Sequence, residues 1–179
     1  MTEHALKTYG LGANRVVVTG AANHRGRSVQ VVGTPPALLD AVQRRFGVLT
    51  WDLAATPENA VAPDWFTEAD DALARPWPRE GVLWLNPPFA NIAPWAAKCA
   101  DWLKAGPRAS SVLLFLVPSS TDANWWAAYV SGSARVLSLC PRVTFVGHTT
   151  PFPKGLALCV YDPRFPVQPA LVEPWRWRT

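Results

Sequence analysis

A tetrapeptide in the middle of the chain, Asn86-Pro87-Pro88-Phe89, carries the most distinctive chemistry of the sequence. It follows an apolar run at 82–85 that is typical of a short buried strand, and two consecutive prolines end any strand pairing. Because proline has no N–H, the backbone carbonyls here can face outward as acceptors, and the Asn86 side chain adds one more carbonyl. Phe89 adds a flat apolar face. Together these groups suit a planar ring that carries an NH2 group.

Such a slot could activate an exocyclic amine. The lone pair of an aromatic amine is drawn into its ring, and two acceptors that bind both amine hydrogens localise that pair on nitrogen, where it can attack an electrophile. The alternative is a purely structural turn that ends a strand, with Asn86 as a local cap. A second predicted strand, 48–54, contains Asp52 close to its end, and this arrangement favours a functional site.

Other reaction types fit the residue pattern less well. Cytosine C5 methylation needs a cysteine that follows a proline, whereas Cys140 precedes Pro141. The three cysteines (Cys99, Cys140 and Cys159) are far apart, so we expect buried structural thiols in a reducing cytoplasm rather than disulfides. The three histidines show no ligand spacing, and we predict no metal. Ser119-Ser120 lacks the glycines of a hydrolase nucleophile turn.

The elements that must position the slot alternate along the chain. We expect Thr34 to cap a helix with Pro35 in its first turn and Gly47 after its end. Further helices should follow Asn91 and Asp122, and strands are predicted at 48–54, 82–85, 111–117, 136–139, 143–146 and 156–161. This alternation predicts an α/β fold with a mostly parallel sheet and an antiparallel edge, in which ligands bind beyond the carboxyl ends of the strands.

The 179 residues and 19.6 kDa suit one compact domain. We predict a basic arm or hairpin at 1–33, the domain at 34–162, and a Pro/Trp/Arg-rich tail at 163–179 that wraps around the domain or is disordered. The formal charge is +3 over 1–33, −4 over 40–80 and +5 over 81–179. Basic flanks around an acidic middle suit a polyanionic partner and a cationic ligand, although a solvated, arginine-rich surface would look the same.

The basic residues predicted to line a phosphate track are Arg15, Arg25, Arg27, Arg135, Arg142 and Lys154. Trp125 and Trp126 are adjacent on one predicted helix and cannot both face the core, so one of them is available to stack on a base or to plug the site. No apolar run approaches the roughly 18 residues of a membrane span and the N-terminus lacks a secretory pattern, so we expect no membrane partner and a cytoplasmic location.

Several stretches together resemble a known family. The tetrapeptide matches motif IV of the DNA adenine N6 amino-methyltransferases, and Thr34-Pro35-Pro36 resembles the T-P element that precedes their cofactor strand. Residues 51–60 (W-D-L-A-A-T-P-E-N-A) and 65–67 are similar to the small phage-encoded enzymes of this group. Residues 151–153, ahead of 156–161, resemble the approach to that group's final strands. The resemblance covers 33–163.

The resemblance implies a Rossmann-like methyltransferase fold of reduced size, with helices on both faces of the sheet. It also implies transfer of a methyl group from S-adenosylmethionine to the N6 amine of adenine in DNA, in a bacterial cell and with a phage or prophage origin. In this family pattern Asn86 and Pro87 hold the amine, and Phe89 stacks on an adenine that is flipped out of the duplex.

The residues that would hold the cofactor are, by the same resemblance, Thr34, Pro35, Asp52, Ala54 and Asp70; for Asp70 a solvated acidic loop is an equal alternative. The glycine-rich loop usual in the family is missing, because Leu53-Ala54-Ala55 follow Asp52. Cofactor binding must therefore depend on Asp52, Ala54 and Thr34.

Three other functions stay open. The same tetrapeptide suits methylation of RNA adenine or of a protein glutamine amide, and the chain could be a non-catalytic nucleic-acid-binding relative. The basic flanks favour a nucleic acid, and intact Asn86 and Phe89 argue against the non-catalytic relative.

Overall fold

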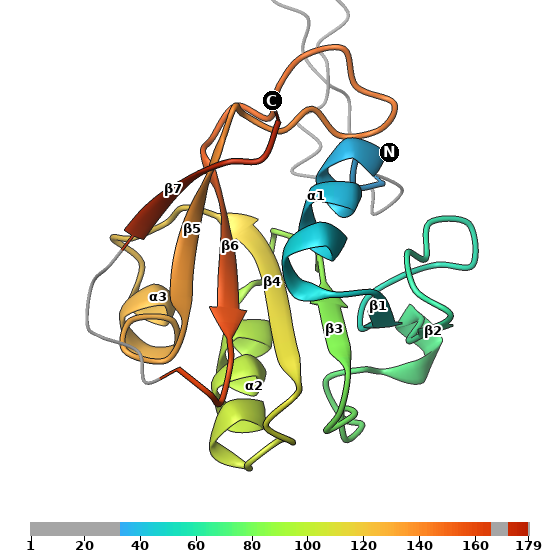
Figure 1. Cartoon of the computed structure of the whole chain (residues 1–179), viewed down its shortest axis with the longest axis vertical. Helices are drawn as coiled ribbons and strands as arrows, with labels where there is room; N and C mark the ends of the chain where they lie inside the picture. The colour runs from blue at the N-terminus through green and yellow to red at the C-terminus, as the bar shows by residue number, and fades with distance from the viewer. Residues whose placement is uncertain (1–32, 166–171, 179) are drawn as a thin grey trace, which may run out of the picture.

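The computed structural model describes residues 33–165 and 172–178 (Figure 1). The predicted arm lies outside these residues apart from Gly33, and so do Arg15, Arg25 and Arg27 of the predicted phosphate track. The helices are α1 (Pro36–Phe46), α2 (Ala93–Lys104) and α3 (Asn124–Tyr129), with one 3-10 turn, η1 (Glu68–Asp70). The strands are β1 (Leu49–Asp52), β2 (Asp64–Trp65), β3 (Val82–Leu85), β4 (Val112–Pro118), β5 (Arg135–Cys140), β6 (Leu156–Tyr161) and β7 (Val172–Arg176). No helix in the described part of the chain is long and apolar enough to cross a membrane.

The seven strands form one sheet in the order β2-β1-β3-β4-β6-β5-β7. The pairs β2–β1, β1–β3 and β3–β4 are parallel, and so is the pair β5–β7. Strand β6 runs antiparallel to both of its neighbours, β4 and β5. The predicted mostly parallel sheet with an antiparallel part is confirmed. The antiparallel strand, however, lies inside the sheet rather than at its edge.

Helices cover both faces of this sheet, as predicted. Strand β4 is buried along its whole length, as central parallel strands are, and its side chains alternate between two cores. Leu114 and Leu116 join α1 in one core, whereas Leu113 and Phe115 join α2 and α3 in the other. Figure 1 shows α2 and α3 together behind the sheet.

Helix α1 begins one residue later than expected and without a side-chain cap. Pro35, in an extended conformation (ψ 137°), takes the N-cap position, and Pro36 is the first helical residue. A missing N–H costs nothing in the first turn, which explains why two prolines are tolerated there. The prediction that Thr34 caps the helix is wrong, because its hydroxyl is used elsewhere, as shown below.

The strand predicted at 143–146 is not a strand. Its backbone groups pair with single residues instead of a neighbouring strand: the Val146 N–H donates to Gly33 O (2.9 Å), and Val143 O accepts from the Phe152 N–H (2.8 Å). Val143 and Phe145 are nevertheless buried, which accounts for the apolar pattern that suggested a strand. The connection from β5 to β6 is therefore a loop that folds back over the carboxyl end of the sheet.

The stretch between β1 and β3 contains only short elements. Strand β2 has two residues, and η1 is a single turn that replaces a full crossover helix. Asp70 closes that turn by accepting hydrogen bonds from the backbone N–H (2.9 Å) and the hydroxyl (2.7 Å) of Thr67.

The C-terminal tail contains an ordered strand that the sequence analysis did not predict. Strand β7 pairs with β5, and Trp177 after it is buried, its indole N–H donating to Pro141 O at 2.8 Å. Glu173 on β7 accepts two hydrogen bonds from the guanidinium of Arg135 on β5, at 2.7 and 2.5 Å. Arg135 is thus engaged by a carboxylate, which argues against its predicted place in a phosphate track.

Candidate active site

A cavity of about 430 Å³ opens at the carboxyl ends of β1 and β3. The sheet order reverses between these strands, since the chain leaves β1 towards β2 on one side and returns to β3 on the other. Such a switch point is where open α/β sheets bind ligands, and the volume lies in the range of small-molecule sites. The lining residues are Gly33, Thr34, Asp52, Ala54, Asn59, Val61, Trp84, Asn86, Pro87, Pro88, Phe89, Phe145, His148, Thr150, Pro151, Phe152 and Pro153.

Asp52 forms one end of this cavity. It is the last residue of β1 and is 3 % exposed. Each carboxylate oxygen accepts one backbone hydrogen bond, from the N–H of Ala54 (3.3 Å) and of Val61 (3.2 Å). Burial raises the pKa of Asp52 to about 6, and the two N–H groups oppose this shift. The carboxylate keeps lone pairs for a ligand, so this end of the cavity suits a cation or a hydroxyl donor.

The segment that follows β1 forms a wall of the cavity without a glycine. Asn59 closes a turn by accepting a hydrogen bond from the Thr56 N–H at 2.7 Å. The segment then returns to β1 at Phe66, whose N–H donates to Asp52 O (2.9 Å). None of these turn residues has a positive φ. Asn59 and Val61 were not predicted as site residues, although an asparagine two residues after a Thr-Pro pair is a typical turn signal that could have drawn attention to them.

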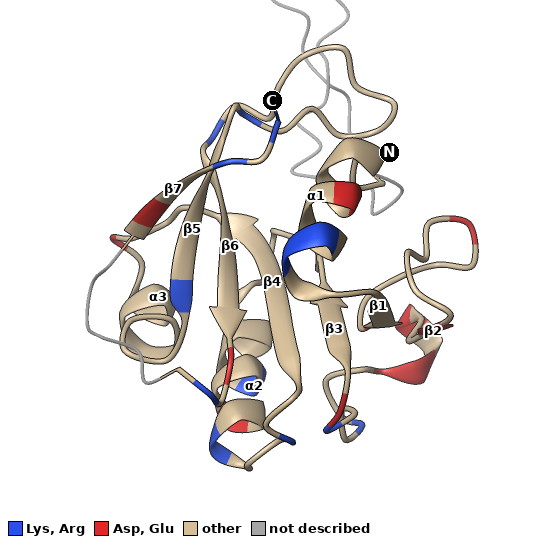
Figure 2. Cartoon of the chain, in the orientation of Figure 1, with Lys and Arg blue, Asp and Glu red and all other residues tan. Residues whose placement is uncertain are grey.

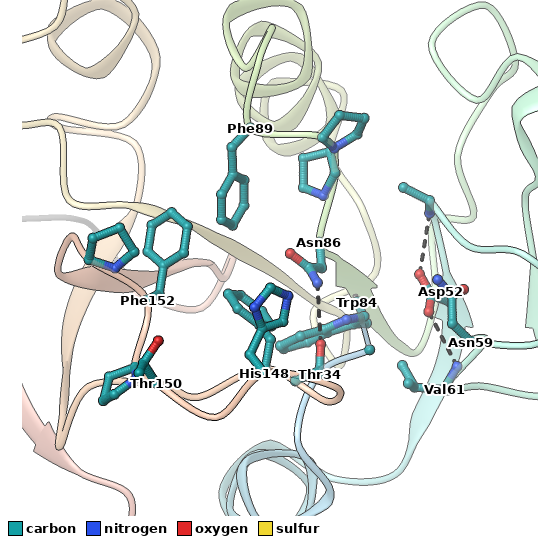
Figure 3. A pocket seen from close by; sticks show the side chains of 17 residues that line it. Thr34, Asp52, Asn59, Val61, Trp84, Asn86, Phe89, His148, Thr150 and Phe152 are labelled. Atoms are coloured by element: carbon teal, nitrogen blue, oxygen red, sulfur yellow. Dashed lines mark hydrogen bonds between the residues drawn. The ribbon is translucent and has the colours of Figure 1, made fainter. Parts of the chain in front are cut away.

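Asn86 lies in the middle of the cavity and its amide has a defined direction (Figure 3). Its Nδ2 donates to Thr34 Oγ1 at 3.3 Å, and Thr34 is only 5 % exposed. The amide oxygen therefore points away from Thr34, toward the side on which Phe89 lies. A hydroxyl two residues before α1 thus orients the acceptor that follows β3.

The prolines and Phe89 complete the other end of the cavity. Pro87 is buried, and Phe89 is half-buried among two more aromatic rings from the loop after β5. The Phe89 ring centroid lies 5.5 Å from that of Phe152 and 6.3 Å from that of Phe145. Figure 3 shows Asp52 on one side of the cavity, Phe89 and Phe152 on the other, and Asn86 between them. The cavity therefore joins an anionic end to an aromatic end.

Most of the predicted site residues meet in this cavity. Thr34, Asp52, Ala54, Asn86, Pro87 and Phe89 all line it. Pro35 is buried directly behind Thr34, and Asp70 lies outside the lining, with its carboxylate capping η1 and 3.6 Å from the Arg75 guanidinium. The residues that sequence reasoning missed come from the segment after β1 and from the loop between β5 and β6. His148, in the loop between β5 and β6, is among them.

The cysteines do not contribute to the cavity. Cys99 and Cys159 are buried as expected, and burial raises the pKa of both thiols, so neither is a ready nucleophile. Cys140 is exposed, contrary to our expectation of a buried thiol, because it ends β5 at the surface.

Comparison with known proteins agrees with the geometry. The family model "DNA N-6-adenine-methyltransferase (Dam)" matches residues 26–153, which include Thr34, Asp52 and Asn86-Pro87-Pro88-Phe89. A DNA N-6-adenine-methyltransferase of Escherichia phage T1 is 22 % identical over 104 residues, which are 58 % of this chain and 42 % of the phage protein. The chain therefore spans less than half the length of that relative. Because the family model covers well over half of the chain, this protein belongs to the DNA N-6-adenine-methyltransferase (Dam) family.

Proposed function

We propose that the protein transfers a methyl group from S-adenosylmethionine to the N6 amine of adenine at specific sites in DNA, on a Rossmann-like methyltransferase fold of reduced size. The observation that carries this proposal is the direction of the Asn86 amide, whose oxygen faces the aromatic end of a cavity that ends in buried Asp52 at its other side. Family membership supports the same reaction and the same class of substrate.

The cavity suits the proposed cofactor chemically. S-adenosylmethionine carries a sulfonium and an ammonium group, and Asp52 is the only acidic residue among the described residues of the lining. Asp52, with Ala54 and Asn59 beside it, would hold the cofactor. A bound cation would favour the ionised form of Asp52 and oppose the effect of burial on its pKa. When bound, the cofactor supplies a methyl group on a positively charged sulfur, which a neutral amine can attack.

The protein's own part is to capture and polarise the amine. Asn86 Oδ1 and the Pro87 carbonyl would accept the two N6 hydrogens, and Phe89 would stack on the ring. Adenine must leave the duplex for this, because its N6 is buried by pairing and stacking. No covalent intermediate with the enzyme is required, so catalysis consists of positioning and hydrogen-bond polarisation.

The test is to incubate the protein with S-adenosylmethionine labelled in its methyl group and with unmethylated DNA, digest the DNA to nucleosides, and identify the labelled base. We expect label in N6-methyladenine with the wild-type protein and very little with Asn86→Ala. Parallel reactions with RNA and with a protein extract test the two other methyl acceptors. Label in RNA or in glutamine but not in DNA would overturn the proposed substrate.

A further inference from the structure

A second cavity, of about 350 Å³, borders the active site and shares the rings of Phe89 and Phe152 with it. It lies at the carboxyl end of β4, between the start of α2 and the start of α3. Its lining consists of Phe89, Ala90, Asn91, Ile92, Ala93, Pro118, Ser120, Trp125, Phe152 and Lys154. The ring against which the target base would stack therefore also lines this second cavity.

Trp125 gives this cavity a free aromatic surface. Neighbouring residues of a helix point about 100° apart, and on α3 Trp126 takes the core position with 4 % exposure. Trp125 is left half-buried at the cavity, and its ring is edge-on to Trp126, with centroids 5.5 Å apart. A half-exposed indole fixed by its neighbour offers a preorganised stacking surface.

The charge of the second cavity is opposite to that of the first. Lys154 is its only charged residue, and it makes no ion pair with any residue in the described ranges. Arg142 lies nearby in the same loop and donates to Pro153 O at 3.3 Å. The ribbon around β2 and the turn after it is instead coloured as acidic in Figure 2. Asp64, Glu68, Asp70 and Asp71 belong to this stretch. The second cavity thus combines a stacking ring with an unpaired cation, which matches a nucleotide.

We propose that the second cavity binds the nucleotide next to the target adenine in the same DNA strand, with Trp125 stacked on its base and Lys154 paired with its phosphate; this rests on the proposed function. The neighbouring nucleotide is tied to the target by one phosphodiester linkage, so it must lie close to Phe89. The second cavity shares Phe89 with the active site, and it offers the Trp125 ring for stacking and the Lys154 ammonium for a phosphate.

The test combines abasic DNA with Trp125 variants. Unmethylated duplexes that contain an adenine site on which the protein acts are made with an abasic residue on the 5′ or the 3′ side of that adenine, and the KM for DNA is measured. For the wild-type protein we expect one of the two abasic duplexes to raise KM about 5- to 140-fold, the fold-change that loss of one stacked base predicts. Trp125→Ala should raise KM similarly on the intact duplex and should not respond further to the abasic residue, whereas Trp125→Phe should respond as the wild type does.

Trp65→Ala is the control for Trp125→Ala, and Lys104→Gln is the control for Lys154→Gln. Trp65→Ala, at an exposed tryptophan on β2, should leave KM unchanged on every duplex. Lys154→Gln should lower the slope of log affinity against log salt by about 0.9, unlike Lys104→Gln at the far end of α2.

If the wild type methylates the intact duplex and tolerates both abasic residues, this inference fails and the proposed function stands. If Trp125→Ala remains sensitive to the abasic residue, Trp125 is not the stacking partner. Methylation of no duplex at all would overturn both proposals.

Discussion

The hydrogen bond from Asn86 Nδ2 to Thr34 Oγ1 orients the Asn86 amide in the active site. Thr34, which lies outside the tetrapeptide, is therefore a positioning residue. Thr34→Val keeps the shape of the side chain but removes the acceptor of Asn86 Nδ2. We expect kcat to fall about 10- to 100-fold, because misplacement of a polarising group costs that much, while the Kd for S-adenosylmethionine changes little. Thr34→Ser should restore the rate.

We expect loss of the Asn86 amide to lower kcat more than loss of the Thr34 hydroxyl that orients it. Asn86→Ala should lower kcat about 10²- to 10³-fold, the usual effect of removing one polarising group. The double variant Thr34→Val/Asn86→Ala should be no slower than Asn86→Ala alone, since Thr34 acts through the amide. Single-turnover methylation assays measure all three rates. Additive losses would show that Thr34 acts on its own, through the cofactor.

Asp52 connects the site to the pH dependence of stability. Its pKa is about 6 in the folded chain and 3.8 as a reference, so the folded state binds the proton more tightly than the unfolded state. The stabilisation that comes from this tighter proton binding is therefore complete below about pH 4 and is lost as the pH rises through 6. The free energy of unfolding falls by about 3 kcal/mol over this range. Asp52→Asn should gain stability relative to the wild type over this range. Urea denaturation from pH 4 to pH 7 measures the difference, with the exposed Asp64→Asn as the control for loss of a carboxylate.

At the scale of elements, the pairing of β1 with β3 determines the distance between Asp52 and Asn86. Gly81, just before β3, has φ +95°, and a Cβ there would lie 2.3 Å from Thr50 Oγ1 on β1. Gly81→Ala should therefore destabilise the protein by more than the roughly 1–2 kcal/mol of the left-handed conformation alone. Gly106→Ala, with φ +70° and open space around it, should show the conformational cost only. Equal losses in urea denaturation would contradict the proposed contact.

The elements also show what a sequence can and cannot predict. Asp52 and Asn86 were found because strand ends are visible as apolar runs that stop at a polar residue, and parallel strands bring such ends together. Phe145 and Phe152 join them only because the loop after β5 folds back on Gly33, and no local pattern records that contact. Strand β7 was missed because Pro174 lies in the middle of its five residues, and a proline argues against a strand unless the strand is at an edge.

At the scale of the whole molecule, the C-terminal segment closes the sheet beyond β5. Trp177 is 4 % exposed, and its indole N–H is bonded to Pro141 O. Trp177→Ala should lower the free energy of unfolding by about 3–5 kcal/mol, the usual cost of truncating a buried large aromatic side chain. Trp65→Ala, which removes an exposed ring, should cost about 0.5 kcal/mol or less. Chemical denaturation compares the two variants, and similar losses would mean that the C-terminal segment contributes nothing to stability.

The sheet order described above also leaves two very different borders. On one side the last strand, β2, has only two residues, both exposed, and one of them is the acid Asp64. On the other side β7 carries Pro174 at its centre, and proline cannot offer an N–H to a further strand. Short, charged or proline-containing borders give an incoming strand few groups to pair with. Within the described chain, both edge strands of the sheet therefore disfavour the addition of a further strand, and with it growth into fibrillar aggregates.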